Sequence, residues 1–163
     1  MPAAIIAVSL AAGSLARADV RVVFENPRGY TDASSFRRGG VEPGAGVLRE
    51  LERYLQRLGE RNLGPTQRLD IRISDVDLAG GFRPSAGALD QVRIVDGLEP
   101  PRITLSYELH ERGRRVASGR ERLADINFQW RSHASGRLGY EKALLRDWFE
   151  DRIVKRRPAR RPG

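Results

Sequence analysis

The most restrictive pattern in the chain is a strict alternation of apolar and polar residues over positions 102–110. Its apolar members, which share one face of a strand, are Ile103, Leu105, Tyr107 and Leu109. Because successive side chains of a strand point to opposite faces, this pattern predicts a strand with one face in the core and the other in water. The chain must therefore build a sheet that is buried on one side.

Four other segments extend this sheet. Arg112 and Gly113 predict a tight turn into a partner strand over positions 116–123, and shorter strands are expected over 20–24 and 92–95. The fourth segment, 69–78, changes its apolar phase between Ile73 and Val76.

A β-bulge near Ser74 or Asp75 explains that phase change. With the bulge, Asp75 and Asp77 point to solvent; without it they would lie unpaired on the core face, which is costly. We therefore expect the bulge.

Two segments have the 3.6-residue periodicity of amphipathic helices, one from about Gly46 to Asn62 and one from Tyr140 to about Val154. The order of elements is β-α-β-β-β-β-α. It predicts an α+β fold with a mainly antiparallel sheet of about four to five strands and two helices packed on one face.

The first eighteen residues have the features of a signal peptide. Positions 3–15 are apolar but too short to span a bilayer, and Ala16, Arg17 and Ala18 form a small-x-small cleavage pattern. We expect cleavage before Asp19, one domain over 19–154, and a periplasmic or secreted location. No later stretch is apolar and long enough for a membrane span, and the chain has no cysteine for a lipoprotein anchor or a disulfide.

Positive charge favours an anionic partner. The chain has 29 Lys and Arg against 21 Asp and Glu, and the densest group in the predicted domain is Arg112, Arg114, Arg115, Arg120 and Arg122. Residues 155–163 carry five basic residues and no acidic one, so they predict a flexible basic tail. Trp130 precedes a polar loop, where an exposed indole is suited to stacking on a sugar or to a membrane interface.

Acidic residues offer a second chemistry. Asp70, Asp75 and Asp77, with the turn residues Asp32 and Asp125, have the side chains of an acid–base pair or a hard-metal site. Acids at turns and strand ends also cap backbone N–H groups or pair with arginine. We favour the structural interpretation, and expect neither a catalytic residue nor a metal.

Other catalytic or cofactor signals are absent from the sequence. His110 and His133 lie in no metal-ligand spacing, and no serine occupies a G-x-S-x-G elbow. Gly44 and Gly46 precede a helix but lack the third glycine of a dinucleotide fingerprint. The sequence thus predicts no cofactor.

Several segments, in this order along the chain, resemble the bacterial domain-of-unknown-function family 3016. They are Phe24-Glu25-Asn26-Pro27, Tyr30-Thr31-Asp32, Asp75-Val76-Asp77-Leu78-Ala79-Gly80, Leu123-Ala124-Asp125-Ile126-Asn127-Phe128, Tyr140-Glu141-Lys142 and Asp147-Trp148-Phe149. The resemblance implies an export signal and one small domain. It implies no activity and no catalytic residue.

Two functional hypotheses follow. We favour a non-enzymatic periplasmic binding or envelope-accessory module whose arginines meet an anionic lipid or polysaccharide. The alternative is a small hydrolase or metal-dependent enzyme that uses Asp75, Asp77 and Asp125. Nucleic acid is the weakest partner hypothesis, because export separates the chain from it.

Overall fold

The computed structural model describes residues 18–32, 45–83, 92–95, 98–130 and 136–155. The predicted leader, apart from Ala18, and the predicted tail beyond Lys155 lie outside the described residues. No helix in the described ranges is long and apolar enough to cross a membrane.

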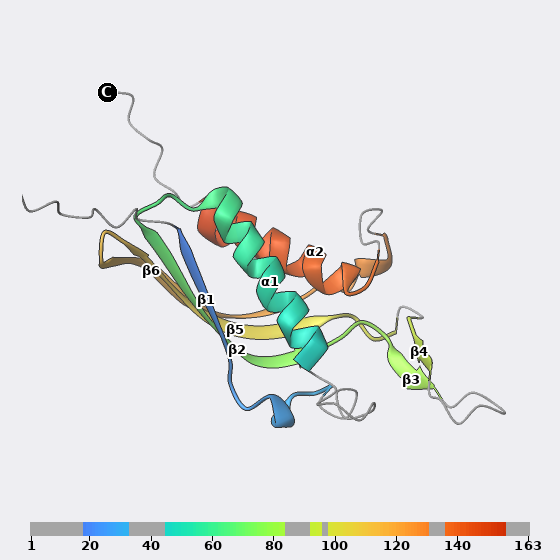
Figure 1. Cartoon of the computed structure of the whole chain (residues 1–163). Coiled ribbons are helices and arrows are strands. Elements are labelled where there is room, and N and C mark those ends of the chain that lie inside the picture. Colours follow the sequence, from blue (N-terminus) through green and yellow to red (C-terminus); the bar gives the residue numbers. More distant parts are fainter. Residues whose placement is uncertain (1–17, 33–44, 84–91, 96–97, 131–135, 156–163) are drawn as a thin grey trace, which may run out of the picture.

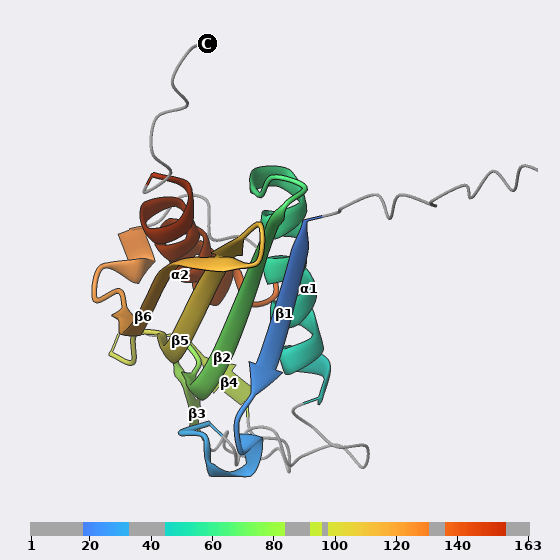
Figure 2. The same ribbon diagram turned by 90° about the vertical axis from the view of Figure 1, so that its left-hand side faces the viewer.

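The main sheet has four strands in the order β1-β2-β5-β6 (Figures 1 and 2). These strands are β1 (Asp19–Phe24), β2 (Gln67–Asp77), β5 (Arg102–Glu111) and β6 (Arg114–Ala124). β2 pairs antiparallel with β5, and β5 pairs antiparallel with β6. The predicted α+β class with a mainly antiparallel sheet is confirmed.

The sheet is nevertheless mixed, because β1 pairs parallel with β2. The connection between them contains the helix α1 (Ala45–Asn62), which returns the chain to the end of the sheet where β1 began. The next strand must then run in the same direction as β1. The alternation within β1 carries no information about this direction.

A small second sheet, formed by β3 (Gly81–Arg83) and β4 (Val92–Ile94), corrects two expectations. The segment expected to link strands contains β3, and the strand expected over 92–95 pairs with β3 instead of joining the main sheet. Gly80 makes this arrangement possible. It has a φ of 76°, and a side chain there would overlap the carbonyl of Ile94.

The bulge predicted in β2 is confirmed. The register with β5 shifts between Ile73 and Asp75, so Ser74 is the additional residue. Val76 is thereby kept in the core. A second shift, which no sequence pattern predicted, occurs in β6, where Val116 is the unpaired residue.

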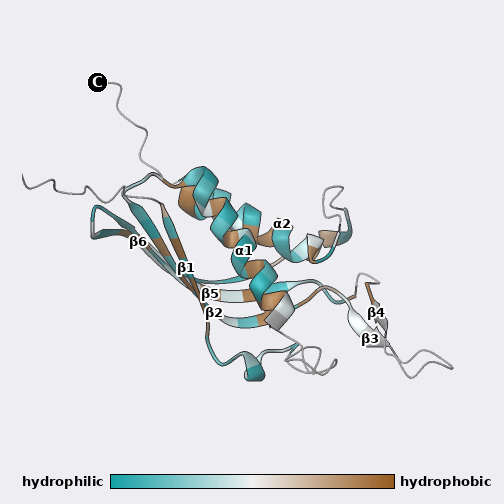
Figure 3. Cartoon of the chain, in the orientation of Figure 1, coloured by the Kyte–Doolittle hydropathy of each residue, from teal (hydrophilic) through white to brown (hydrophobic). Residues whose placement is uncertain are grey.

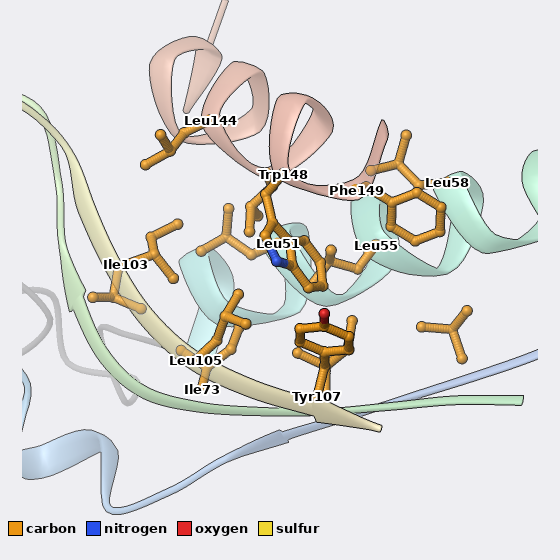
Figure 4. Packing of buried hydrophobic residues seen from close by; sticks show 14 of the residues in the cluster. Leu51, Leu55, Leu58, Ile73, Ile103, Leu105, Tyr107, Leu144, Trp148 and Phe149 are labelled. Carbon is orange, nitrogen blue, oxygen red and sulfur yellow. The ribbon is translucent and has the colours of Figure 1, made fainter. Parts of the chain in front are cut away.

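Both helices cover one face of the main sheet, while the other face is open (Figure 2). Hydrophobic and hydrophilic residues alternate along the strands and around α1 (Figure 3). In the core between sheet and helices, Leu51 and Leu55 of α1 meet Leu105 and Tyr107 of β5 (Figure 4). The Tyr107 ring lies edge-on to Trp148, with their centroids 5.5 Å apart.

The second helix, α2 (Gly139–Phe149), is shorter than predicted because the last turns change type. Residues 150–154 form a π-helix, in which the N–H of Lys155 donates to the carbonyl of Glu150 at 2.9 Å. Ile153 remains buried. The apolar stripe therefore predicted helical backbone to Val154, but not the change of hydrogen-bond pattern.

Gly59 determines how closely α1 approaches β1. A side-chain carbon added at this buried position would overlap Cγ2 of Val20. Glycine is otherwise unfavourable inside a helix by roughly 1 kcal/mol relative to alanine. The close approach of helix and strand explains why it is here.

We predict that Gly59→Ala lowers the free energy of unfolding by about 1–3 kcal/mol, in spite of the better helix propensity of alanine. Val20→Ala removes the overlapping atom, so the double variant should be more stable than the sum of the single effects predicts. Urea unfolding of the unaltered protein, the two single variants and the double variant measures this coupling. Additive effects would contradict the proposed overlap.

Candidate functional site

β6 carries most of the arginines that the sequence singled out. Arg112 and Gly113 form the turn before it, with φ values of 49° and 76°. Arg114 is exposed at the start of the strand. Arg115 lies opposite His110 and pairs with Glu108 at 3.1 Å. One of the five arginines is thus engaged by a neighbouring carboxylate.

Arg120 and Arg122 differ from Arg115, because no described carboxylate pairs with them. They lie opposite Ser106 and Thr104 of β5, so they share the open face of the sheet. Both are exposed and neither forms an ion pair within the described ranges. Between them, Glu121 points to the helix side, where it pairs with Arg152 at 2.8 Å. Strand alternation therefore separates the acid from the two arginines.

The open face is hollowed over its centre, with a volume of about 660 Å³. Ser106 of β5 and Ser118 of β6, which lies opposite Glu108, both line this hollow, and their short side chains leave it open. Longer charged residues surround them. These residues are Asp19, Arg21, Arg68, Asp70, Arg72 and Glu108. The hollow therefore combines hydroxyl groups with charges of both signs.

Some of these charges neutralise each other. Arg68 pairs with Asp70 at 3.1 Å, and Arg72 pairs with Glu25 at 3.4 Å. Arg21 on β1 has no carboxylate partner in the described ranges, which is also true of Arg120 and Arg122 on the far strand. Arginines without ion pairs among the described residues therefore lie at both edges of the open face, although the exposed Asp19 beside Arg21 on β1 forms no ion pair there either.

The fold does not place Trp130 beside the arginines at the hairpin turn. It ends a short 3-10 helix, Phe128–Trp130, that follows β6, whereas Arg112 and Arg114 lie at the other end of this strand. The eleven residues of β6 span about 35 Å. The six predicted binding residues are therefore distributed along the strand and do not form one cluster.

The conspicuous acids have structural contacts. Asp75 accepts hydrogen bonds from the N–H of Thr31 at 2.7 Å and from its hydroxyl at 2.8 Å. Asp77 pairs with Arg102 at 3.1 Å. Burial raises the pKa of Asp77, and the hydrogen bond from Arg102 opposes this shift.

The other acids and histidines behave similarly. Asp32 accepts the N–H of Leu78 at 2.6 Å, and Asp125 accepts the N–H of Asn127 at 3.0 Å. His110 faces Asp70, with 3.5 Å between the nitrogen and the carboxylate. Among the described residues, no three His, Asp or Glu side chains are grouped to hold a metal. His133 and Gly44 lie outside the described residues.

The sequence analysis missed buried polar residues, among them Glu141 and Tyr30, which join distant segments. Glu141 is 3% exposed, and its carboxylate accepts the N–H of Ala79 at 2.8 Å. Tyr30 donates its hydroxyl to the carbonyl of Ile73 at 2.6 Å, and burial raises its pKa. The position of Glu141 on the apolar stripe of α2, three residues before Leu144, was the available signal.

These contacts join segments that carried the family resemblance. Residues 30–32 and Glu141 both bind the region around the end of β2. A model of the family described as protein of unknown function (DUF3016) matches residues 18–151. The chain belongs to this family. Searches of curated proteins and of solved structures found no match.

The DUF3016 domain thus has a buried carboxylate that holds the end of β2 to α2. Glu141→Ala removes the carboxylate that accepts the buried N–H of Ala79 and should lower the free energy of unfolding by about 1–3 kcal/mol. Glu141→Gln retains an acceptor and should recover part of this loss. Chemical unfolding of both variants measures the difference. A loss of equal size in both would show that the hydrogen bond to Ala79 is not the cause.

Proposed function

We propose that this DUF3016 protein is an exported, non-enzymatic binding module whose open sheet face attaches to an anionic envelope component, either lipid or polysaccharide. The observation that carries the proposal is the pair Arg120 and Arg122, exposed on one face with no carboxylate partner among the residues that the structure describes. Guanidinium groups bind phosphate and carboxylate through paired hydrogen bonds. Unpaired arginines on a fixed strand are well placed for such contacts.

The hollow beside these arginines supports the same function. Ser106 and Ser118 supply hydroxyl groups that donate and accept hydrogen bonds, which suits the oxygen-rich surface of a head group or a sugar. Arg21 adds a cation on the opposite edge of the hollow. Arg112 and Arg114 extend the positive charge to the hairpin turn. In our proposal, the five basic residues within 155–163 add to this positive charge, although all of that segment except Lys155 lies outside the described residues.

No specific observation favours the enzymatic alternative. Asp75 is engaged by Thr31 and Asp77 by Arg102, while Asp125 caps a local backbone N–H. These contacts give each carboxylate a separate structural role.

We predict that Arg120→Gln with Arg122→Gln weakens binding to anionic ligands. An arginine near an anionic surface contributes about 1 kcal/mol at low salt, so the two together should account for roughly 30-fold in affinity. The measurement is co-sedimentation with vesicles that contain phosphatidylglycerol, and retention on an immobilised anionic polysaccharide, each over a salt series.

The matched control is Arg49→Gln with Arg53→Gln, which removes the same charge from the exposed surface of α1. It should retain nearly the binding of the unaltered protein. Equal losses in the two double variants would indicate a general charge effect and would contradict a role for the open sheet face. Binding that is independent of salt would contradict it too.

Export is a separate part of the proposal, supported by the apolar run before Ala16-Arg17-Ala18. Protein recovered from the periplasm of a bacterial host should begin at Asp19, which mass spectrometry of the intact chain determines. Full-length chain in the cytoplasmic fraction, with none in the periplasm, would refute export.

A further inference from the structure

Large apolar side chains are exposed mainly at one end of the main sheet. Leu98 is 76% exposed, Ile126 80% and Trp130 87%. Ile94 and Val95, at the end of the small sheet, are also exposed. Among the described residues, the remaining large exposed apolar side chain is Val116, at the hairpin end of β6.

The topology places these segments together. β5 begins at Arg102, which pairs with Ala124 at the end of β6, so the residues before β5 and after β6 leave the sheet at the same end. β2 ends there as well, because Asp77 also pairs with Arg102. The small sheet of β3 and β4 extends from this end (Figure 1). We call Leu98, Ile126 and Trp130 the apolar end.

The segment after β6 is held in a way that exposes its apolar residues. Phe128 is buried and lies edge-on to Tyr140, with ring centroids 4.9 Å apart. This anchor fixes the chain between Ile126 and Trp130, both of which stay outside the core. Exposed apolar side chains on a fixed segment have an unfavourable free energy in water, which an apolar partner would remove.

The size of the apolar end argues against a second copy of the chain as that partner. A stable protein interface buries about 800 Å² on each side. Three side chains, even with an aromatic residue of 150–250 Å², supply roughly half of this area. Insertion of a few protruding side chains between lipid head groups requires no such continuous flat surface.

The charges near the apolar end also fit an anionic bilayer. Arg122 lies two residues before the end of β6 and has no carboxylate partner in the described part of the chain. Several described acids near this end have protein partners: Asp75 is bound by Thr31 and Asp77 by Arg102, and Glu99 turns one oxygen into the interior. Asp32 and Asp125 accept backbone N–H groups.

We propose that the protein docks on an anionic lipid bilayer with its apolar end, so that Ile126, Leu98 and Trp130 enter the interfacial region while Arg122 and Arg120 contact lipid phosphates. This inference rests on the proposed function and names the membrane as the anionic partner. Tryptophan is enriched at membrane interfaces, where its ring lies among acyl chains and its N–H reaches polar groups. Arginine extends from such a position to the head groups.

Trp130 fluorescence tests the insertion directly. The probe is a vesicle of phosphatidylglycerol and phosphatidylcholine, with or without bromine on the acyl chains, added to the chain that begins at Asp19. Emission of Trp130 should shift to the blue and be quenched by the brominated chains. The Trp130→Phe variant gives the fluorescence of the buried Trp148 alone, and this is subtracted from the fluorescence of the unaltered protein.

Two further variants distinguish the contribution of apolar insertion to vesicle binding from the contribution of charge. Leu98→Ser with Ile126→Ser keeps the Trp130 probe and should weaken binding to the vesicles at least about tenfold, since less apolar surface leaves water. Val116→Ser removes an exposed apolar side chain from the other end of β6 and should leave binding unchanged. Circular dichroism confirms that each variant is folded.

The outcomes distinguish the two proposals. Salt-sensitive binding to anionic vesicles without a shift or quenching of Trp130 overturns the insertion and leaves the proposed function standing. If the variant with Arg120→Gln and Arg122→Gln binds vesicles at full affinity and Trp130 is still quenched, the role of the open face and the arginine contacts to lipid phosphates are overturned, and only the insertion of the apolar side chains stands. Failure to bind vesicles, with retained binding to an anionic polysaccharide, also overturns the insertion. The protein could also self-associate and fail to bind vesicles. If Leu98→Ser with Ile126→Ser then abolished the self-association, the apolar end would be assigned to contact with a second copy of the chain.

Discussion

Burial of one face of β2 and β5 is the constraint on which the rest of the structure depends. Ile71, Ile73 and Leu105 are fully buried between the sheet and the helices. Because strand side chains alternate, every residue placed in the core also places its neighbour on the open face. The arginines of β6 are therefore positioned by the packing on the other side of the sheet. The bulge at Ser74 keeps this alternation in phase with β5 over the whole length of β2.

Local patterns were sufficient to predict much of this fold. The alternation in β5, the phase change at Ser74 and the helical stripes each depend on residues close in sequence. The direction of β1 and the pairing of β3 with β4 depend on residues far apart, so no local pattern predicted them. The change to a π-helix after Phe149 depends on backbone hydrogen bonds that the apolar stripe does not specify.

The candidate site was predictable to a smaller extent. The strand expected over 116–123 is sufficient to place Arg120 and Arg122 on one face, because alternate residues of a strand share a face. Their lack of partners, the hollow over Ser106 and the separation of Trp130 from the turn are properties of the folded chain. Non-local contacts such as that between Glu141 and Ala79 likewise required the structure. The family assignment, which covers residues 18–151, supplies no function by itself.

The central claim is that the open face of the sheet, and not positive charge in general, meets the anionic partner. Its most direct test is modification of arginines by phenylglyoxal in the unaltered protein, with and without anionic vesicles, followed by mass spectrometry of the peptides. We predict that the vesicles protect Arg120 and Arg122, while Arg49 and Arg53 on α1 stay fully reactive. Protection of the α1 arginines, with Arg120 and Arg122 still reactive, would contradict it.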